Sequence, residues 1–319
     1  MTGGSQSALD PAGPFAGHIL ELFWLFTIVC AVVWLAVVAV LLAAIGRRRW
    51  AGDELPDPRL AREAERRLGR VVGAAVVLTV VILFGFLIAS YLTDRQLLAG
   101  QQGETRTIHL TAHQWWWEIS YEDGNPSRRV TTANELHLPA GEKIHIRLSS
   151  TDVIHSFWVP NLHGKQDLIP GVENHIYLQA DEPGVWRGQC AEFCGFQHAH
   201  MALHVVVEDK DAFERWKAAQ LQPAPEPAGD LETRGRDVFL SGPCVMCHRI
   251  SGTEAAATAG PDLTHLKSRG TIAAGTLPNT REHLAAWITD PQAIKPGNRM
   301  PLTQLEPGDL EALRGMCNK

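Results

Sequence analysis

Residues 190–201 read CAEFCGFQHAHM, and no other stretch of this length in the chain carries as much metal-binding chemistry. Two thiols lie four residues apart, an imidazole follows four residues later, and a thioether lies three residues beyond that. A tight loop between two strands would bring these side chains into one small volume. Thiolate, imidazole and thioether together are the soft ligands that suit copper. The stretch therefore predicts a copper site that uses Cys190, Cys194, His198 and Met201.

Two cysteines that bridge a pair of copper ions need a second histidine from elsewhere in the chain. His155, in the segment HSFWVP at 155–160, is the leading candidate because it stands where a strand ends before a loop. Two other interpretations remain open at this point. An exported domain lies in an oxidising compartment, so Cys190 and Cys194 could form a disulfide. Cysteine and histidine also bind zinc, although zinc would leave Met201 without a role.

The residues around this stretch predict a β-domain over 95–221. Apolar and polar residues alternate at 107–113, 135–138, 143–148, 175–179 and 203–207, with Gly, Pro and Asn turn signals between these segments. Short strands with such turns favour an antiparallel sandwich or barrel. Residues 211–221 predict a short amphipathic helix that closes the domain. The strand histidines are assigned no functional role.

Two apolar runs precede the β-domain, at about 19–45 and 71–92, and each is long enough to cross a bilayer. The connecting loop 46–70 carries eight arginines against five acids, and positive loops stay cytoplasmic. Residues 1–94 therefore predict a transmembrane hairpin whose two ends face outward. The rest of the chain has 21 basic and 30 acidic residues, without the basic patches that nucleic-acid binding requires. The lipid membrane is an expected partner, and nucleic acid is not.

The other end of the chain predicts a small haem domain. A proline-rich linker, QPAPEPAG at 222–229, separates the β-domain from residues 230–319, where helices are expected over 230–240, 280–289 and 307–316. Residues 244–248 read CVMCH, the attachment signature of c-type haem. Cys244 and Cys247 would form the thioether bonds, and His248 would ligate the iron. A redox-active cysteine pair is the alternative.

The sixth haem ligand has to come from further along the chain. Met300, in the loop KPGNRMP at 295–301, is the preferred candidate, since a loop methionine can approach the far face of the haem. His265 and His283 are the remaining alternatives. Met246 lies between the attachment cysteines and is badly placed for this role, whereas Met316 belongs to the last helix and is expected to pack.

Four segments together resemble subunit II of the haem–copper cytochrome c oxidases over roughly residues 15–220. They are CAEFCGFQHAHM at 190–201, HSFWVP at 155–160, GKQDLIPG at 164–171 and HQWWW at 113–117. The resemblance implies a cupredoxin domain with a dinuclear copper centre, CuA, bridged by Cys190 and Cys194. It further implies one copper ligand each from His155 and His198, with Met201 and the Glu192 carbonyl as axial ligands.

The same resemblance implies roles beyond the copper ions. The Glu192 carboxylate would help to bind Mg²⁺ at the interface with subunit I. Trp115 would pass electrons to CuA, and Asp167 is a possible docking acid for donors. Subunits of this family often carry a glutamate followed by a tryptophan at the start of the second span, feeding a proton channel. Here Glu63 and Glu65 lie in that region without the tryptophan, and neither is assigned the role.

Residues 230–316 resemble a class I cytochrome c, in which the Pro261 carbonyl would accept a hydrogen bond from His248. The whole is therefore expected to be a multidomain membrane protein: a two-helix transmembrane hairpin, an all-β cupredoxin domain and an all-α class I cytochrome c domain. The combination is similar to the caa-type oxidases of bacteria. It implies the bacterial inner membrane, with both ends of the chain on the periplasmic or extracellular side.

The function that this resemblance implies is electron transfer in aerobic respiration. Electrons from a cytochrome c or a bc-type complex would enter at the covalent haem c, pass to CuA and continue to subunit I. Subunit I, with the other oxidase subunits, would reduce O₂ to water and pump protons. Two alternatives are an electron-transfer subunit of another respiratory reductase and a membrane-anchored copper or redox-sensing protein. A quinol oxidase subunit would lack the copper ligands.

Overall fold

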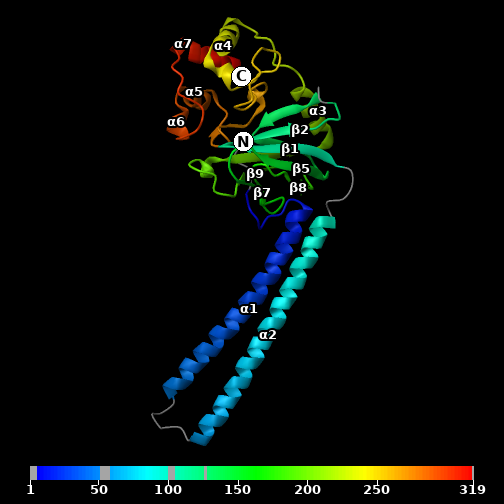
Figure 1. The fold of residues 1–319 in the computed structure, drawn as a ribbon, viewed down its shortest axis with the longest axis vertical. Coiled ribbons are helices and arrows are strands. Elements are labelled where there is room, and N and C mark those ends of the chain that lie inside the picture. Colours follow the sequence, from blue (N-terminus) through cyan, green and yellow to red (C-terminus); the bar gives the residue numbers. More distant parts are fainter. Residues whose placement is uncertain (1–5, 51–57, 100–104, 126–127, 318–319) are drawn as a thin grey trace. The chain divides into compact units, whose positions relative to one another are not determined.

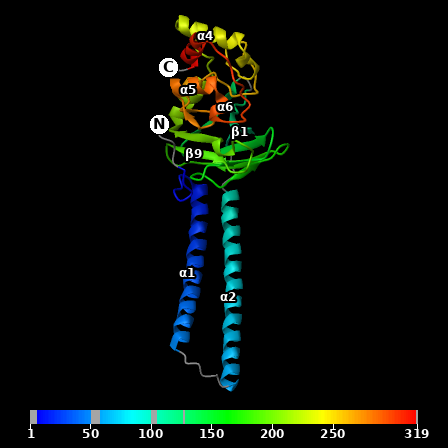
Figure 2. The same cartoon turned by 90° about the vertical axis from the view of Figure 1, so that its left-hand side faces the viewer.

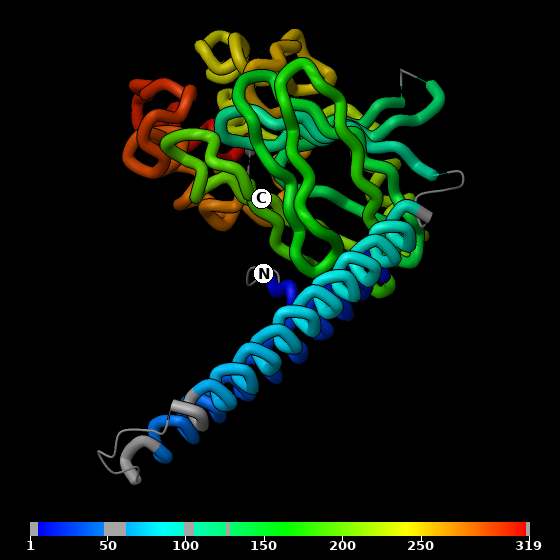
Figure 3. The backbone as a smooth tube through the Cα atoms, turned by 60° about the horizontal axis from the view of Figure 1, so that its bottom comes forward, coloured from blue at the N-terminus to red at the C-terminus, as the bar shows by residue number. Residues whose placement is uncertain are grey.

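The computed structural model describes residues 6–50, 58–99, 105–125 and 128–317, and it divides into two compact units. The smaller unit, residues 17–102, contains most of α1 (Pro14–Trp50) and all of α2 (Pro58–Ala99). These two helices lie side by side in all views (Figures 1–3), and Phe26 stacks on Phe86 between them with ring centroids 4.1 Å apart. Their apolar side chains are largely exposed, as expected of helices that face lipid.

The helices extend further than the two apolar runs predicted. Candidate membrane spans cover Pro14–Arg47 and Arg62–Leu98, so helix continues into the arginine-rich segment that was predicted as the loop 46–70. Alanine, arginine, leucine and glutamate are good helix formers, and that segment is rich in them. Residues 51–57 of the predicted loop lie outside the described residues.

The larger unit, residues 1–16 and 103–319, holds a β-sandwich followed by a helical domain (Figure 1). One sheet has the order β3-β2-β1-β5-β8 and the other β4-β10-β9-β6-β7. The first sheet is built from β1 (Arg106–His113), β2 (Trp116–Tyr121), β3 (Val130–Ala133), β5 (Ile144–Ser150) and β8 (Asn174–Leu178). The second is built from β4 (Glu135–Pro139), β6 (His155–Trp158), β7 (Gln166–Leu168), β9 (Gly184–Cys190) and β10 (Ala202–Glu208).

The pairing is mostly antiparallel, but β1 runs parallel to β5 and β10 runs parallel to β4. Alternate residues of the strands point into one apolar core between the sheets, where Trp117, Phe157 and Leu148 are fully buried. The helix α3 (Lys210–Gln220) covers one end of this core through Phe213. The predicted β-domain and its closing helix are therefore present.

The C-terminal domain is helical, with α4 (Asp230–Ser241), α5 (Arg281–Thr289), α6 (Pro291–Ile294) and α7 (Pro307–Cys317) (Figure 2). A ladder of two short strands, β11 (Thr271–Ile272) and β12 (Leu277–Pro278), is its only sheet among the described residues. The helices α4 and α7 pack closely because Gly235 has no side chain: a Cβ there would lie 2.2 Å from the Ala312 carbonyl oxygen. This contact joins the two ends of the domain.

Candidate functional site

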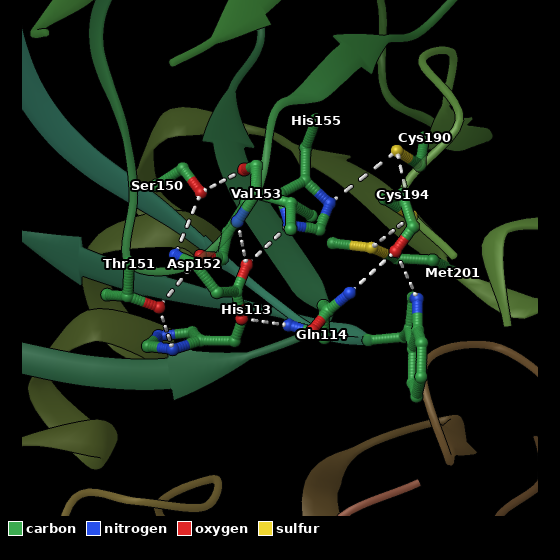
Figure 4. Close-up of polar contacts among 12 residues, drawn as sticks. His113, Gln114, Ser150, Thr151, Asp152, Val153, His155, Cys190, Cys194 and Met201 are labelled. Atoms are coloured by element: carbon green, nitrogen blue, oxygen red, sulfur yellow. Dashed lines mark hydrogen bonds and ion pairs between the residues drawn. The ribbon is translucent and has the colours of Figure 1, made fainter. Parts of the chain in front are cut away.

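The cysteine loop, residues 190–201, lies between two neighbouring strands of the second sheet (Figure 4). It starts at Cys190, the last residue of β9, and ends at Met201, directly before β10. The backbone amide of Cys190 donates to the Met201 carbonyl oxygen, which closes the loop at its base. A short 3-10 helix, η2 (His198–His200), turns the chain back towards β10. The sheet therefore holds both ends of the loop in place.

Two cysteines and one histidine of this loop lie close together, and a second histidine comes from the neighbouring strand β6. The Cys190 and Cys194 Sγ atoms are 3.7 Å apart, His155 Nδ1 is 3.8 Å from Cys190 Sγ, and His198 Nδ1 is 3.7 Å from Cys194 Sγ. His155 comes from the start of β6, whose Phe157 pairs with Cys190. The register between β6 and β9 thus brings together residues 35 positions apart.

Two weaker donors complete this set of atoms. The Met201 sulfur lies 3.9 Å from Cys194 Sγ, and the Glu192 carbonyl oxygen lies 3.2 Å from Cys190 Sγ. Met201, His155, Cys190 and Cys194 are buried. The sulfur–sulfur distance is well beyond the 2.05 Å of a disulfide, so the disulfide interpretation does not hold in this structure. The six predicted copper-binding residues fit one site with soft donors at its centre.

The surroundings of the Cys190 and Cys194 thiols favour one negative charge on the pair. The hydrogen bond between the Cys190 and Cys194 side chains, together with the facing His155, holds the pKa of Cys190 well below its usual range despite burial. The anionic sulfur, in turn, raises the pKa of Cys194, because a second negative charge so close is unfavourable. A bound cation would remove this conflict by stabilising both thiolates.

Asp152 supports His155 and was missed in the sequence. Its carboxylate lies 2.9 Å from His155 Nε2 and accepts hydrogen bonds from the backbone amides of Gln114 and Val153 (Figure 4). Burial opposes both charges, yet these bonds lower the pKa of Asp152, and those to Cys190 and Asp152 raise the pKa of His155. Metal-ligating histidines commonly use their second nitrogen in this way. The position of Asp152, three residues before His155, was the feature of the sequence that could have indicated this role.

Trp115 is joined directly to the cysteine loop. Its indole Nε1–H donates to the Cys194 carbonyl oxygen over 2.9 Å, and the residue is only 8% exposed. Gln114 donates to the same oxygen through its side-chain amide. Trp117, two residues further, packs in the sandwich core against Phe157. Trp115 therefore contacts the cysteine loop, whereas Trp117 contacts His155 through its ring, with ring centroids 6.2 Å apart.

The candidate haem site surrounds His248. The ring Nδ1–H of His248 donates to the Pro261 carbonyl oxygen over 2.8 Å, as the cytochrome c resemblance implied, which leaves Nε2 to face a metal. Burial lowers the pKa of His248 and so favours the neutral ring that ligates iron. Gly260 contacts the ring closely, since a Cβ there would lie 2.7 Å from His248 Cε1. Cys244 and Cys247 are both free thiols.

The candidates for the sixth haem ligand differ in their surroundings. Met316 packs in the core of the C-terminal domain, as expected, and Met246 is 70% exposed. His265 Nε2 contacts the backbone oxygens of Gln220 and Gln222, and His283 pairs with Thr280, so both alternative histidines are occupied. Met300 lies at the end of segment 291–300, which is made of α6 and the turn that follows it. Met300 remains the preferred ligand.

Comparisons with known proteins place the two halves of the larger unit in two families. Residues 125–209 match the family of the cytochrome c oxidase subunit II periplasmic domain, and residues 232–314 match the cytochrome c family. The cytochrome c oxidase subunit 2 of Alkalihalophilus pseudofirmus is 37% identical over 311 residues, which cover 96% of this chain and 88% of that protein. The corresponding Bacillus subtilis protein is 29% identical with the same coverage.

Two further relatives extend this comparison. The quinol oxidase subunit 2 of Bacillus cereus is 28% identical over 227 residues, covering 70% of this chain and 76% of that protein. Among solved structures, the periplasmic domain of cytochrome oxidase subunit II from Bradyrhizobium japonicum is 28% identical, with a TM-score of 0.35. That match covers 37% of this chain and 95% of the solved domain.

Proposed function

This chain belongs to the cytochrome c oxidase subunit 2 family and carries a cytochrome c domain, and from this we propose that it feeds electrons to subunit I of a caa-type oxidase. Electrons would enter at haem c in the C-terminal domain and leave through CuA in the β-domain. The observation that carries this proposal is the convergence of His155, Cys190, Cys194 and His198 on one buried site.

The copper ligands would act as a rigid frame. Cys190, Cys194, His155 and His198 would hold the copper pair, together with the Met201 sulfur and the Glu192 carbonyl oxygen. A bound copper pair supplies a carrier that shares one electron over two ions. Strands β10, β9 and β6 are neighbours in one sheet and anchor these residues, which keeps ligand movement small when the charge changes.

In the C-terminal domain, Cys244 and Cys247 would hold the haem covalently, and His248 and Met300 would bind its iron. The hydrogen bond from His248 to Pro261 orients the ring and fixes which nitrogen faces the iron. Haem c supplies a one-electron carrier, and a thioether ligand raises its potential. The free thiols and the lowered pKa of His248, which favours the neutral ring, support this assignment.

The membrane hairpin sets the location and the partners of these sites. We place residues 1–16 and 103–319 on the periplasmic side of the bacterial inner membrane, because the arginine-rich connection between the helices would stay in the cytoplasm. Subunit I would reduce O₂ to water and pump protons. The Glu192 carboxylate, which accepts from the Phe193 amide, would help to hold Mg²⁺ at the contact with subunit I. A cytochrome c or bc-type complex would be the donor.

The alternatives make different predictions about metals. A copper-delivery or redox-sensing protein predicts labile copper and gives no role to the haem motif. A different respiratory reductase predicts the same two centres but a different catalytic subunit on purification. A quinol oxidase subunit is disfavoured despite its similarity, because all six copper-binding residues are present and converge here.

The test uses the full chain, purified in detergent after expression with copper and c-haem maturation. We expect two coppers and one covalent haem per chain, and an EPR signal from one electron shared by two equivalent coppers. Cys190→Ser should abolish that signal, whereas Cys30→Ser, at an exposed thiol of α1, should leave it unchanged. Mononuclear copper or zinc in the wild-type chain would overturn the proposal. The oxidase that co-purifies from the native membrane would identify the catalytic subunit.

A further inference from the structure

The C-terminal domain contacts the β-domain through several segments, and one of them lies beside the cysteine loop. This segment is residues 291–300, made of α6 and the turn that follows it, which we call the docking loop. Lys295 is the central residue of this loop and is only 3% exposed. Its ammonium group donates to three carbonyl oxygens: those of Trp115 at 3.0 Å, His200 at 2.9 Å and Ala273 at 3.2 Å. The first two belong to the β-domain and the third to the C-terminal domain. An ammonium has three N–H donors, so this cage uses all of them.

Other contacts of the same interface surround Lys295. Gln197 of the cysteine loop donates to the Pro296 carbonyl oxygen over 2.7 Å, and Arg299 lies 3.6 Å from the Asp152 carboxylate. Away from the docking loop, the Glu135 carboxylate accepts from the amides of Gly270 and Thr271. The docking loop therefore contacts Gln197 and His200, which are close to copper ligands in the sequence. It also contacts Asp152, the acid that supports His155.

The docking loop is rigid enough to transmit its position to Met300. Gln292 donates to the carbonyl oxygens of Asn298 and Met300, and Asn298 donates to those of Pro291 and Lys295. The Met300 amide donates to the Asn298 side chain. These bonds tie the loop to itself over its whole length. Placing Lys295 therefore also places Met300, the preferred haem ligand.

A buried ammonium without an acid partner is costly unless its hydrogen bonds are satisfied. Lys295 is satisfied only where the three carbonyls converge, so other orientations of the two domains are penalised. We propose that Lys295 is a positioning residue, which holds the haem domain against Trp115 and the cysteine loop at one fixed orientation. The proposal rests on the proposed function, since it assumes haem c and CuA. The step it serves moves one electron from haem iron to the copper pair, without making or breaking a bond.

The test compares Lys295→Met with Lys267→Met in the full chain. Lys267 pairs with Glu232 inside the C-terminal domain, so its replacement is a matched control. With methionine at position 295, the Trp115 and His200 carbonyls lack a donor in the docked arrangement but regain water when the domains separate. We expect haem-to-CuA transfer, started by photoreduction, to slow at least about tenfold in Lys295→Met, corresponding to about 1.4 kcal/mol. It should also become dependent on solvent viscosity, because the domains must then find each other.

A second measurement does not depend on electron transfer. Hydrogen exchange of the Gly270 and Thr271 amides, which donate across the interface, should quicken in Lys295→Met and not in Lys267→Met. Intact metal spectra with unchanged transfer and exchange in Lys295→Met would overturn the inference. If that variant fails to fold, Lys295→Gln, whose amide has two N–H donors and cannot satisfy three carbonyl oxygens, carries the same expectations. A wild-type chain without the copper pair or haem would instead defeat the proposed function.

Discussion

At the scale of single residues, the candidate copper site depends on partners that do not themselves reach the metal. Asp152 is the clearest of them, because its carboxylate contacts His155 Nε2 while two backbone amides hold it in place. This arrangement fixes the ring and leaves Nδ1 towards Cys190. Partners of this kind contribute both to metal affinity and to the orientation of the ligand.

Replacing Asp152 should therefore weaken copper binding without removing a ligand. We expect Asp152→Asn to lower copper affinity by about 10- to 100-fold, because His155 loses its charged partner. Competition with a chelator of known affinity measures this. Asp167→Asn changes an acid on β7 outside the site and is the control. Equal affinities for the two variants would contradict the role of Asp152.

Gly260 allows a single-residue test at the haem site. Gly260→Ala would bring a Cβ to 2.7 Å from His248 Cε1, so the ring or the chain has to move. Such overpacking typically costs about 1–3 kcal/mol. We expect a loss of this size in the free energy of unfolding of the C-terminal domain, followed through haem absorption. Gly229→Ala meets nothing within 4 Å and should change little. Similar losses in both would show that the close approach is not responsible.

At the scale of elements, β4, β10 and α3 meet around a buried histidine that was assigned no role from the sequence. His137 on β4 lies 3.0 Å from the Glu208 carboxylate of β10, and its ring stacks on Trp216 of α3. Burial opposes its charge, but Glu135 and Glu208 together raise the pKa of His137. The two acids therefore favour the protonated form of this histidine at this corner of the sandwich.

The raised pKa predicts how stability depends on pH. A group whose pKa is higher in the folded state stabilises it fully below its unfolded value of about 6.5, and loses this contribution as pH rises through the folded value. His137→Gln should therefore cost more unfolding free energy at pH 6 than at pH 9, by about 1–2 kcal/mol. Urea unfolding of both chains at both pH values measures the difference. A cost that is independent of pH would show that the histidine is not charged in the fold.

At the scale of the whole larger unit, the proline-rich linker is not a free tether. The Ala224 amide donates to the Ser251 carbonyl oxygen, Glu226 pairs with Arg236, and the Ala228 amide donates to Glu232. These contacts hold the linker against the C-terminal domain. The relative placement of the two domains depends on the contacts of the docking loop more than on the length of this connection.

Lengthening the linker tests that distinction. Four Gly-Ser residues inserted between Gln222 and Pro223 should leave haem-to-CuA transfer unchanged within about twofold, since a docked pair does not depend on effective concentration. The same insertion in Lys295→Met should slow transfer further, because the separated domains then rely on the tether. Photoreduction kinetics of the four chains provide the comparison. Slower transfer after insertion in the otherwise unchanged chain would contradict a docked arrangement.

The sequence by itself determined what is encoded locally. Cys190, Cys194, His198 and Met201 lie within twelve residues, and CVMCH at 244–248 is shorter still, so spacing alone indicates their chemistry. The apolar runs and the alternating strands are equally local patterns. His155 was the leading candidate for the second histidine from its place beside a predicted strand, but strand register, and not spacing, is what places it beside Cys190.

Only the tertiary structure decided how these parts support one another. Lys295 and Trp115 are 180 positions apart. Nothing in the sequence near either residue predicts that Lys295 donates a hydrogen bond to the Trp115 carbonyl oxygen. Glu135 and Gly270, which meet at the same interface, are as hard to connect from sequence. The physical reason is that metal and haem ligands must be particular residue types, and these stand close together in the sequence, so they can be recognised there. The contacts between the domains use backbone groups, which every residue carries. Which of these groups meet is decided only when the chain has folded.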